Sequence, residues 1–104
     1  MKIKSGVTNV GTSGTAVRLR NTEEIVIRVY LTPLVGNTSH VYFGDSTVEG
    51  SGTVSGIELP KGSTTSEPIF LDFTKNGQGG VLFKDLYVDA ATNGDDLSWV
   101  AIIQ

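Results

Sequence analysis

The amino-acid sequence predicts a single all-β domain, either a small β-sandwich or a jelly-roll-like barrel of about eight short antiparallel strands. Valine, isoleucine and threonine are common, whereas the strong helix formers are scattered. Thirteen glycines divide 104 residues into short apolar or alternating runs. Runs of this kind, repeated roughly every 8–12 residues, are typical of strands joined by tight turns. We therefore treat residues 1–104 as one β-sandwich domain.

The first two strands are expected over residues 2–10 and 15–20. The first mixes lysines with Ile3 and Val7, and we interpret it as a strand that also has the character of an N-terminal arm. The second alternates, with Val17 and Leu19 on one face and arginines on the other. Alternation with a period of two places one face of a strand toward the core.

The clearest alternating strand is expected over residues 25–31. Its seven residues are mostly β-branched and Pro33 follows closely, so a strand is favoured over a helix. The side chains predicted to share one face are Ile25, Ile27, Val29 and Leu31. Val26, Arg28 and Tyr30 share the opposite face.

The middle of the chain holds further short strands separated by polar loops. The strands are expected over residues 40–44, 56–60, 68–73 and 81–83. Residues 45–56 are rich in Ser, Thr and Gly and are interpreted as a surface loop. Residues 74–80 are interpreted as a flexible glycine-rich loop.

The closing stretch, residues 86–103, predicts a hairpin. Its centre contains Asn93-Gly94-Asp95, and Asn-Gly accepts the positive φ that chain reversal requires. The second half carries the only tryptophan, Trp99, in a nearly unbroken apolar run to Ile103. A strand that is apolar on both faces is either central in the domain or covered by another subunit.

Charge and composition narrow the classes of function. The formal net charge is −3 and no cluster of lysine and arginine occurs, so nucleic-acid binding is disfavoured. There are no cysteines, so disulfides and thiolate metal sites are not available. No apolar run reaches the length of a signal sequence or a membrane span, and neither secretion by a cleaved signal nor membrane insertion is expected.

A hydrolase motif is present only in fragment. Phe43-Gly44-Asp45-Ser46 resembles the nucleophile block of the GDSL hydrolases. Those enzymes need an α/β scaffold and a downstream Asp-x-x-His, whereas the only histidine here, His40, lies upstream. Without a base to accept its proton, Ser46 is an ordinary hydroxyl in a turn. We expect no catalytic residue and no enzymatic activity.

No metal or cofactor site is expected either. The oxygens of Asp89, Asn93, Asp95 and Asp96 are a candidate calcium set, but their spacing is not that of a twelve-residue calcium loop. A lone histidine such as His40 is rarely a metal ligand. The Asn37-Thr38-Ser39 glycosylation sequon is interpreted as a chance match, because no signal sequence is recognised.

Four aromatic residues offer an alternative, carbohydrate-binding function. They are Tyr30, Tyr42, Tyr87 and Trp99. Sugar-binding modules use exposed aromatic platforms, but in a small sandwich such residues more often fill or border the core. An exposed Trp99 or a tyrosine pair would favour sugar binding, and a buried Trp99 would oppose it.

Three sequence blocks together resemble small β-sandwich virion proteins of tailed bacteriophages, of the head-decoration, head-fibre or minor structural type. The blocks are Val41–Val48, Gly56–Gly62 and Leu86–Ala90 with the following Gly94 and Ser98-Trp99. The long loop at residues 74–80 departs from that pattern. The resemblance implies a non-enzymatic capsid decoration (cement) or head-fibre subunit that stabilises the particle through protein–protein contacts.

The same resemblance implies partners and a location. The expected partners are the major capsid protein or other virion proteins, together with further copies of the chain, and a trimer is favoured. Neither nucleic acid nor a membrane is an expected partner. The expected location is the virion, assembled in the host cytoplasm. The segments expected to make contacts are residues 2–10, the 45–56 loop and the apolar run 99–103. The alternative function is a carbohydrate- or host-surface-binding module of a tail or fibre.

Overall fold

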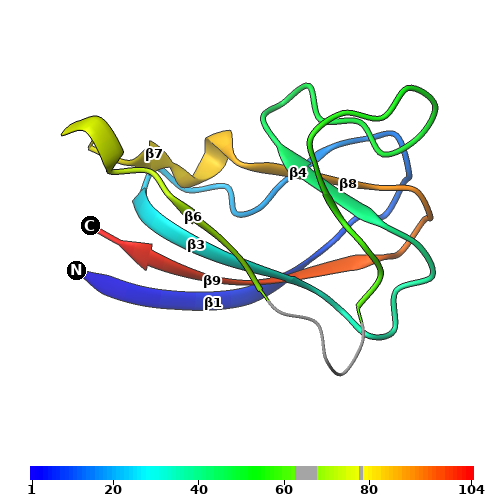
Figure 1. Ribbon diagram of the computed structural model, residues 1–104, viewed down its shortest axis with the longest axis horizontal. Coiled ribbons are helices and arrows are strands. Elements are labelled where there is room, and N and C mark those ends of the chain that lie inside the picture. The colour runs from blue at the N-terminus through cyan, green and yellow to red at the C-terminus, as the bar shows by residue number, and fades with distance from the viewer. Residues whose placement is uncertain (63–67, 78) are drawn as a thin grey trace.

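The computed structural model describes residues 1–62, 68–77 and 79–104, and these fold as a sandwich of two antiparallel sheets (Figure 1). One sheet has the strand order β1-β9-β3-β6, with β7 also paired to β3. The other has the order β2-β8-β4-β5. The predicted all-β class and antiparallel pairing are therefore confirmed, with about nine strands in place of about eight.

The strands lie close to the stretches expected from the sequence. Their bounds are β1 Lys2–Asn9, β2 Val17–Arg18, β3 Ile25–Pro33, β4 Val41–Gly44, β5 Ile57–Leu59, β6 Ile69–Asp72, β7 Val81–Leu82, β8 Tyr87–Ala90 and β9 Asp96–Ile103. Their short lengths follow from the frequent glycine turns. At Gly94, for example, φ is +87°, in the left-handed region that glycine adopts without strain.

The last strand of the chain is a central strand of the larger sheet. β9 pairs with β1 on one side, where Lys2 lies opposite Ile103, and with β3 on the other. The two chain ends consequently lie side by side (Figure 1). The central position, one of the two explanations open from the sequence, accounts for the inward-facing Trp99, Ala101 and Ile103, whereas Val100 and Ile102 lie on the other side of the sheet.

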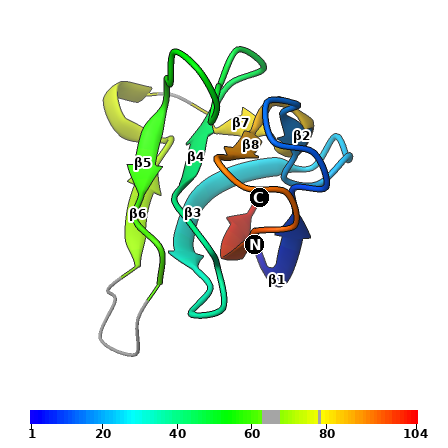
Figure 2. The same ribbon diagram turned by 90° about the vertical axis from the view of Figure 1, so that its right-hand side faces the viewer.

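Strand β3 departs from the expected alternation at its start. The register shifts between Val26 and Arg28, which indicates a β-bulge. Because the extra residue reverses the alternation, Val26 is fully buried together with Val29, although the sequence pattern placed them on opposite faces. A bulge also bends its strand, and Figure 2 shows β3 curving strongly along its length.

Two expected segments are not regular strands along their full length. The strand expected over 15–20 is reduced to two paired residues of β2, and the one expected over 81–83 ends at Leu82. A 3-10 turn, η2 (Phe83–Asp85), follows directly. A second 3-10 turn, η1 (Lys75–Gly77), lies in the expected 74–80 loop, in which Gln78 is outside the described residues. Over the described ranges, no helix is long and apolar enough to cross a membrane.

The core lies between the inner faces of the two sheets. Each sheet contributes alternate residues, such as Leu31, Leu97 and Trp99 from one and Val41, Phe43 and Val88 from the other. Phe83 from η2 fills one end of the core, with its ring centroid 5.0 Å from that of Trp99 in an edge-to-face arrangement. Burying these apolar side chains supplies the main driving force for folding.

Candidate functional site

The outer surface of the five-stranded sheet carries a group of exposed apolar side chains. Cross-strand pairing arranges them in rows. Ile3 of β1 lies opposite Ile102 of β9. Tyr30 of β3 lies between Val100 of β9 and Phe70 of β6. We call this set the outer apolar face, and its members are Ile3, Val7, Tyr30, Phe70, Val100 and Ile102.

Four members of the outer apolar face are well exposed. The exposed fractions are 72% for Ile3, 58% for Val7, 47% for Phe70 and 38% for Val100. Tyr30 and Phe70 pack against each other with ring centroids 5.0 Å apart. Beside them Pro68, Ser98 and Val100 border a shallow hollow of about 310 Å³. Clustered apolar surface of this kind marks an interaction site more often than single exposed residues do.

Strand β1 adds an unpaired edge to this face. It pairs with β9 over all eight of its residues and is the terminal strand of its sheet. The N-terminal segment expected as a strand or arm is thus part of the sheet, and no second strand among the described residues pairs with its other edge. An exposed edge strand is a template for pairing with another chain. Edge lysines such as Lys2 and Lys4 are a common means of limiting that pairing.

The outer apolar face borders an ion pair between adjacent strands. Arg28 Nε lies 3.4 Å from a carboxylate oxygen of Asp72, directly across the β3–β6 pair. Hydrogen bonds from the Thr74 hydroxyl and backbone N–H, with the Arg28 guanidinium, hold the pKa of Asp72 below its ordinary value. A hydrogen bond from Thr22, together with the cations of Lys4 and Arg20, also lowers the pKa of Glu24.

These lowered pKa values predict that acid weakens the fold. A carboxyl group whose pKa is lower in the folded state contributes stability that is fully present above its unfolded-state pKa, near 4, and is lost as the pH falls through the folded-state pKa. We expect the melting temperature to fall as the pH is lowered from about 5 to about 3. The Asp72→Asn variant should show a shallower fall over that range. Melting curves at matched ionic strength test this, and identical slopes for wild type and variant would contradict it.

Ser46 and His40 do not form a catalytic pair in this fold. His40 precedes β4 and Ser46 follows it, so the strand separates them. The imidazole Nδ1 of His40 accepts a hydrogen bond from the backbone N–H of Lys61 at 3.3 Å. Asp45, beside Ser46, accepts two hydrogen bonds from Thr47, as expected of an Asp-Ser turn.

The four candidate calcium ligands each accept hydrogen bonds from different protein groups. Asn93 accepts the backbone N–H of Ser13, and Asp96 accepts the side-chain amide of Asn9, both at 2.8 Å. Asp95 accepts the backbone N–H groups of Thr38 and Ser39 at 2.8 and 2.9 Å. Asp89 is fully buried and accepts those of Gly14 and Gly50 at 3.1 and 2.8 Å. Among the residues that the structure describes, no group of three acidic, histidine or cysteine side chains is arranged to hold a metal ion.

Asp89 is a structural residue that the sequence pattern did not identify. Alternation placed it with Tyr87 on one face of its strand. In the structure Asp89 fixes the 12–14 turn and the 45–56 loop against that face through the two glycine N–H groups. The close approach requires glycine at position 50, because a Cβ there would lie 2.6 Å from the backbone carbon of Ala90. The 45–56 loop, expected as a contact surface, is therefore anchored at Gly50.

The sequon asparagine, Asn37, also has a structural role. Its side chain is 6% exposed and donates to the carbonyl oxygen of Asp96 at 2.8 Å. The side-chain oxygen Oδ1 of Asn37 accepts a hydrogen bond from the backbone N–H of Asp96, also at 2.8 Å. Asn37 thus links the loop after β3 to the start of β9, and its amide nitrogen is engaged within the fold.

The four aromatic residues of the carbohydrate hypothesis are not brought together. Tyr30 lies on the outer apolar face, whereas Tyr42 and Tyr87 belong to the other sheet. The Tyr42 hydroxyl donates to Glu58 at 3.0 Å, and burial together with that carboxylate raises the pKa of Tyr42. Trp99 is 4% exposed and points into the core, where its indole N–H donates to Thr8 Oγ1 at 2.9 Å. The buried Trp99 counts against a sugar platform built on it.

Comparison of the chain with protein-family models, with curated proteins and with solved structures found no match in any of the three.

Proposed function

We propose that this protein is a non-enzymatic structural protein of a tailed-phage virion, a capsid decoration or head-fibre subunit that acts through protein–protein contacts. The resemblance of the three sequence blocks supports this role. The two-sheet fold is compatible with it, since such a subunit needs a stable scaffold and contact surfaces. The observation that carries the proposal is the outer apolar face, whose exposed side chains are suited to burial against a protein partner.

The contact that we propose uses the outer apolar face together with the free edge of β1. Two β1 strands that pair antiparallel around Ser5 would place Ile3 of each copy opposite Val7 of the other. Lys4 would then face Gly6, so no two lysines lie directly opposite. This self-complementary arrangement joins the outer apolar faces of two copies and forms a two-fold dimer. A trimer would instead need a head-to-tail contact, with β1 of one copy against a different edge of the next.

A charge placed on the outer apolar face should prevent self-association. We expect Val7→Glu to raise the dissociation constant of the oligomer at least about tenfold, because the two-fold contact would lose both of its apolar cross-strand pairs, each worth about 0.2–1 kcal/mol. Val35→Glu is the matched control, since Val35 is 61% exposed in a loop whereas Val7 is 58% exposed on the face. Light scattering on a sizing column over a range of concentrations measures the mass of each. Wild-type protein that remains monomeric throughout would overturn the proposed self-association.

The virion role itself is tested on particles. Purified particles of the phage that encodes the chain should contain the protein in a fixed number of copies, measured by quantitative mass spectrometry against the major capsid protein. Particles assembled with the Val7→Glu variant should carry fewer copies, whereas those with Val35→Glu should carry the wild-type number. If the protein is abundant in the lysate and absent from washed particles, the proposal fails.

A further inference from the structure

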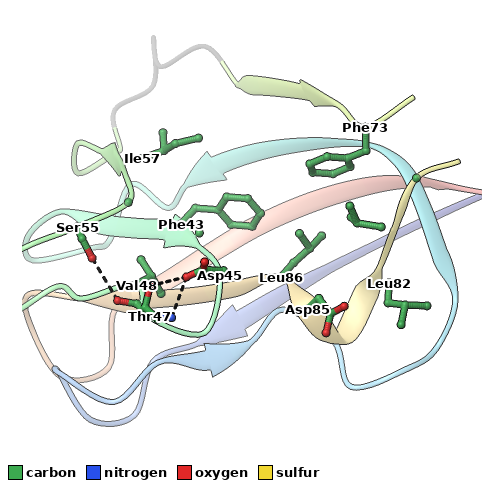
Figure 3. Close-up of a pocket in the computed structure, with 14 residues that line it drawn as sticks. Phe43, Asp45, Thr47, Val48, Ser55, Ile57, Phe73, Leu82, Asp85 and Leu86 are labelled. Atoms are coloured by element: carbon green, nitrogen blue, oxygen red, sulfur yellow. Dashed lines mark hydrogen bonds between the residues drawn. The ribbon is translucent and has the colours of Figure 1, made fainter. Parts of the chain in front are cut away.

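A second candidate site, separate from the outer apolar face, is a cavity between the edges of the two sheets. Its volume is about 770 Å³. On one side lie the end of β4, the loop after it and the start of β5, and on the other lie the end of β6, β7 and η2. Phe43, Phe73 and Leu86 converge on this space from three different segments (Figure 3). Val48 and Val81 complete most of its apolar wall.

Glycines keep the cavity open. Gly56 and Gly80 both line it, with φ values of +111° and +101° that disfavour any other residue. A Cβ at Gly56 would lie 2.8 Å from the carbonyl oxygen of Phe43, and one at Gly80 would lie 2.7 Å from that of Val26. The backbone is therefore closely packed at the wall while contributing no side chain to the interior. The cavity therefore depends on the path of the backbone as well as on the side chains that line it.

The charges on the cavity are all of one sign. Asp45 and Asp85 line it, and its described lining includes no lysine, arginine or histidine. Both aspartates are exposed and lie on the same side of the cavity as Leu86 in Figure 3. Hydrogen bonds from the Thr47 hydroxyl and backbone N–H lower the pKa of Asp45, so this carboxyl stays ionised at neutral pH. One carboxylate oxygen of Asp45 accepts both of these bonds.

We infer that this cavity is a binding site for a small apolar molecule that carries a cationic group such as a protonated amine. The volume lies within the range of roughly 300–1,000 Å³ that is usual for small-molecule sites. The apolar wall buries the hydrocarbon part of the ligand, and Asp45 and Asp85 at one side bind the ammonium group through charge-assisted hydrogen bonds. An anionic ligand of the same shape is disfavoured, because it meets two carboxylates and no cation. This inference is independent of the virion role.

Three probes of equal chain length test the inference: octylamine, octanol and octanoate. Each is titrated into the ¹⁵N-labelled full chain below its aggregation concentration, and amide shifts report both the affinity and the location. We expect octylamine to shift the amides of Gly44, Gly56 and Gly80, and to bind at least about tenfold more tightly than octanoate, with octanol between them. If no probe shifts these amides, or if all three bind equally, the inference is overturned.

Charge variants separate the cavity from general binding to an acidic protein. Asp85→Lys should remove or reverse the preference for octylamine over octanoate, because the exposed position tolerates a cation and changes the sign of the site. Asp96→Asn is the control, since Asp96 lies at the start of β9 and its amide replacement keeps an acceptor for Asn9. An unchanged preference in Asp85→Lys, or an equal loss in Asp96→Asn, would show that the carboxylates of the cavity do not select the ligand. Melting temperatures measured beside the titrations confirm that both variants are folded.

Discussion

Replacing Asp89 with alanine is expected to lower the free energy of unfolding by about 3–5 kcal/mol. The carboxylate is fully buried and accepts the backbone N–H groups of Gly14 and Gly50 and of its neighbour Ala90. Removing it leaves the buried N–H groups of Gly50 and Ala90 without a partner, and each such loss costs about 1–3 kcal/mol, whereas Gly14 is exposed. For a domain of this size the change is a large part of the total stability, which is typically about 5–15 kcal/mol.

Chemical denaturation of Asp89→Ala and of a matched control gives the test. Asp45→Ala is the control, because Asp45 also accepts a backbone N–H, from Thr47, but is exposed to water. Solvent replaces the lost acceptor at Asp45, so its loss should be much smaller. Asp89→Asn should fall between the two, since one acceptor oxygen remains while the new amide group faces a second donor. Equal midpoints for Asp89→Ala and Asp45→Ala would show that Asp89 does not hold the two loops.

Trp99→Ala is expected to lower the free energy of unfolding by a similar amount, about 3–5 kcal/mol. The indole lies in the core against Phe83 and over Gly6, where a Cβ would be only 2.7 Å from the ring. Alanine would leave a void lined by these groups and would remove the hydrogen-bond donor to Thr8. Trp99→Phe keeps most of the side-chain volume but loses the indole N–H donor, so it should be markedly less destabilising than Trp99→Ala.

Tyr30→Ala on the outer apolar face is the comparison for Trp99. Tyr30 contacts Phe70 at the surface and is partly exposed, so its removal opens no closed cavity. Urea titrations of the three variants should rank Trp99→Ala as the least stable. The same proteins test the carbohydrate alternative on a glycan array. Sugar binding by wild type that Tyr30→Ala abolishes would favour that alternative over the structural role.

The sequence predicted the fold class and most strand positions because two-residue periodicity is a local property. The alternation of β9, in which Leu97, Trp99, Ala101 and Ile103 all face inward, survives in the structure. The residues that alternate with them are less buried, as a sheet with one covered face requires. The central position of β9 was left open, because a strand that is apolar on both faces is either central in the domain or covered by another subunit.

The features that the sequence did not reveal depend on contacts between distant segments. At the bulge in β3, the register of pairing with β9 changes between Val26 and Arg28. No local sequence pattern around Ile27 indicates this change. Asp89 resembles any polar residue on an exposed strand face until the loop carrying Gly50 closes over it. Alternation along the chain already placed Phe70 on the face opposite to Ile69 and Leu71. The order of the strands was needed to show that Phe70 lies beside Tyr30.

The pairing of β9 between β1 and β3 also determines when the protein is able to fold. A ribosome delivers the strands in chain order, so β9, which separates β1 from β3, is made after the other eight described strands of the sandwich. Until it emerges, both of its neighbours have open edges and the inner face of the sheet lacks Trp99. The larger sheet therefore cannot be completed until β9 has been made, and it must then form contacts of very high sequence separation, which makes all-β domains slow to fold. A chain that lacks β9 would expose these edges and the inner face, and would be a target for proteases and aggregation.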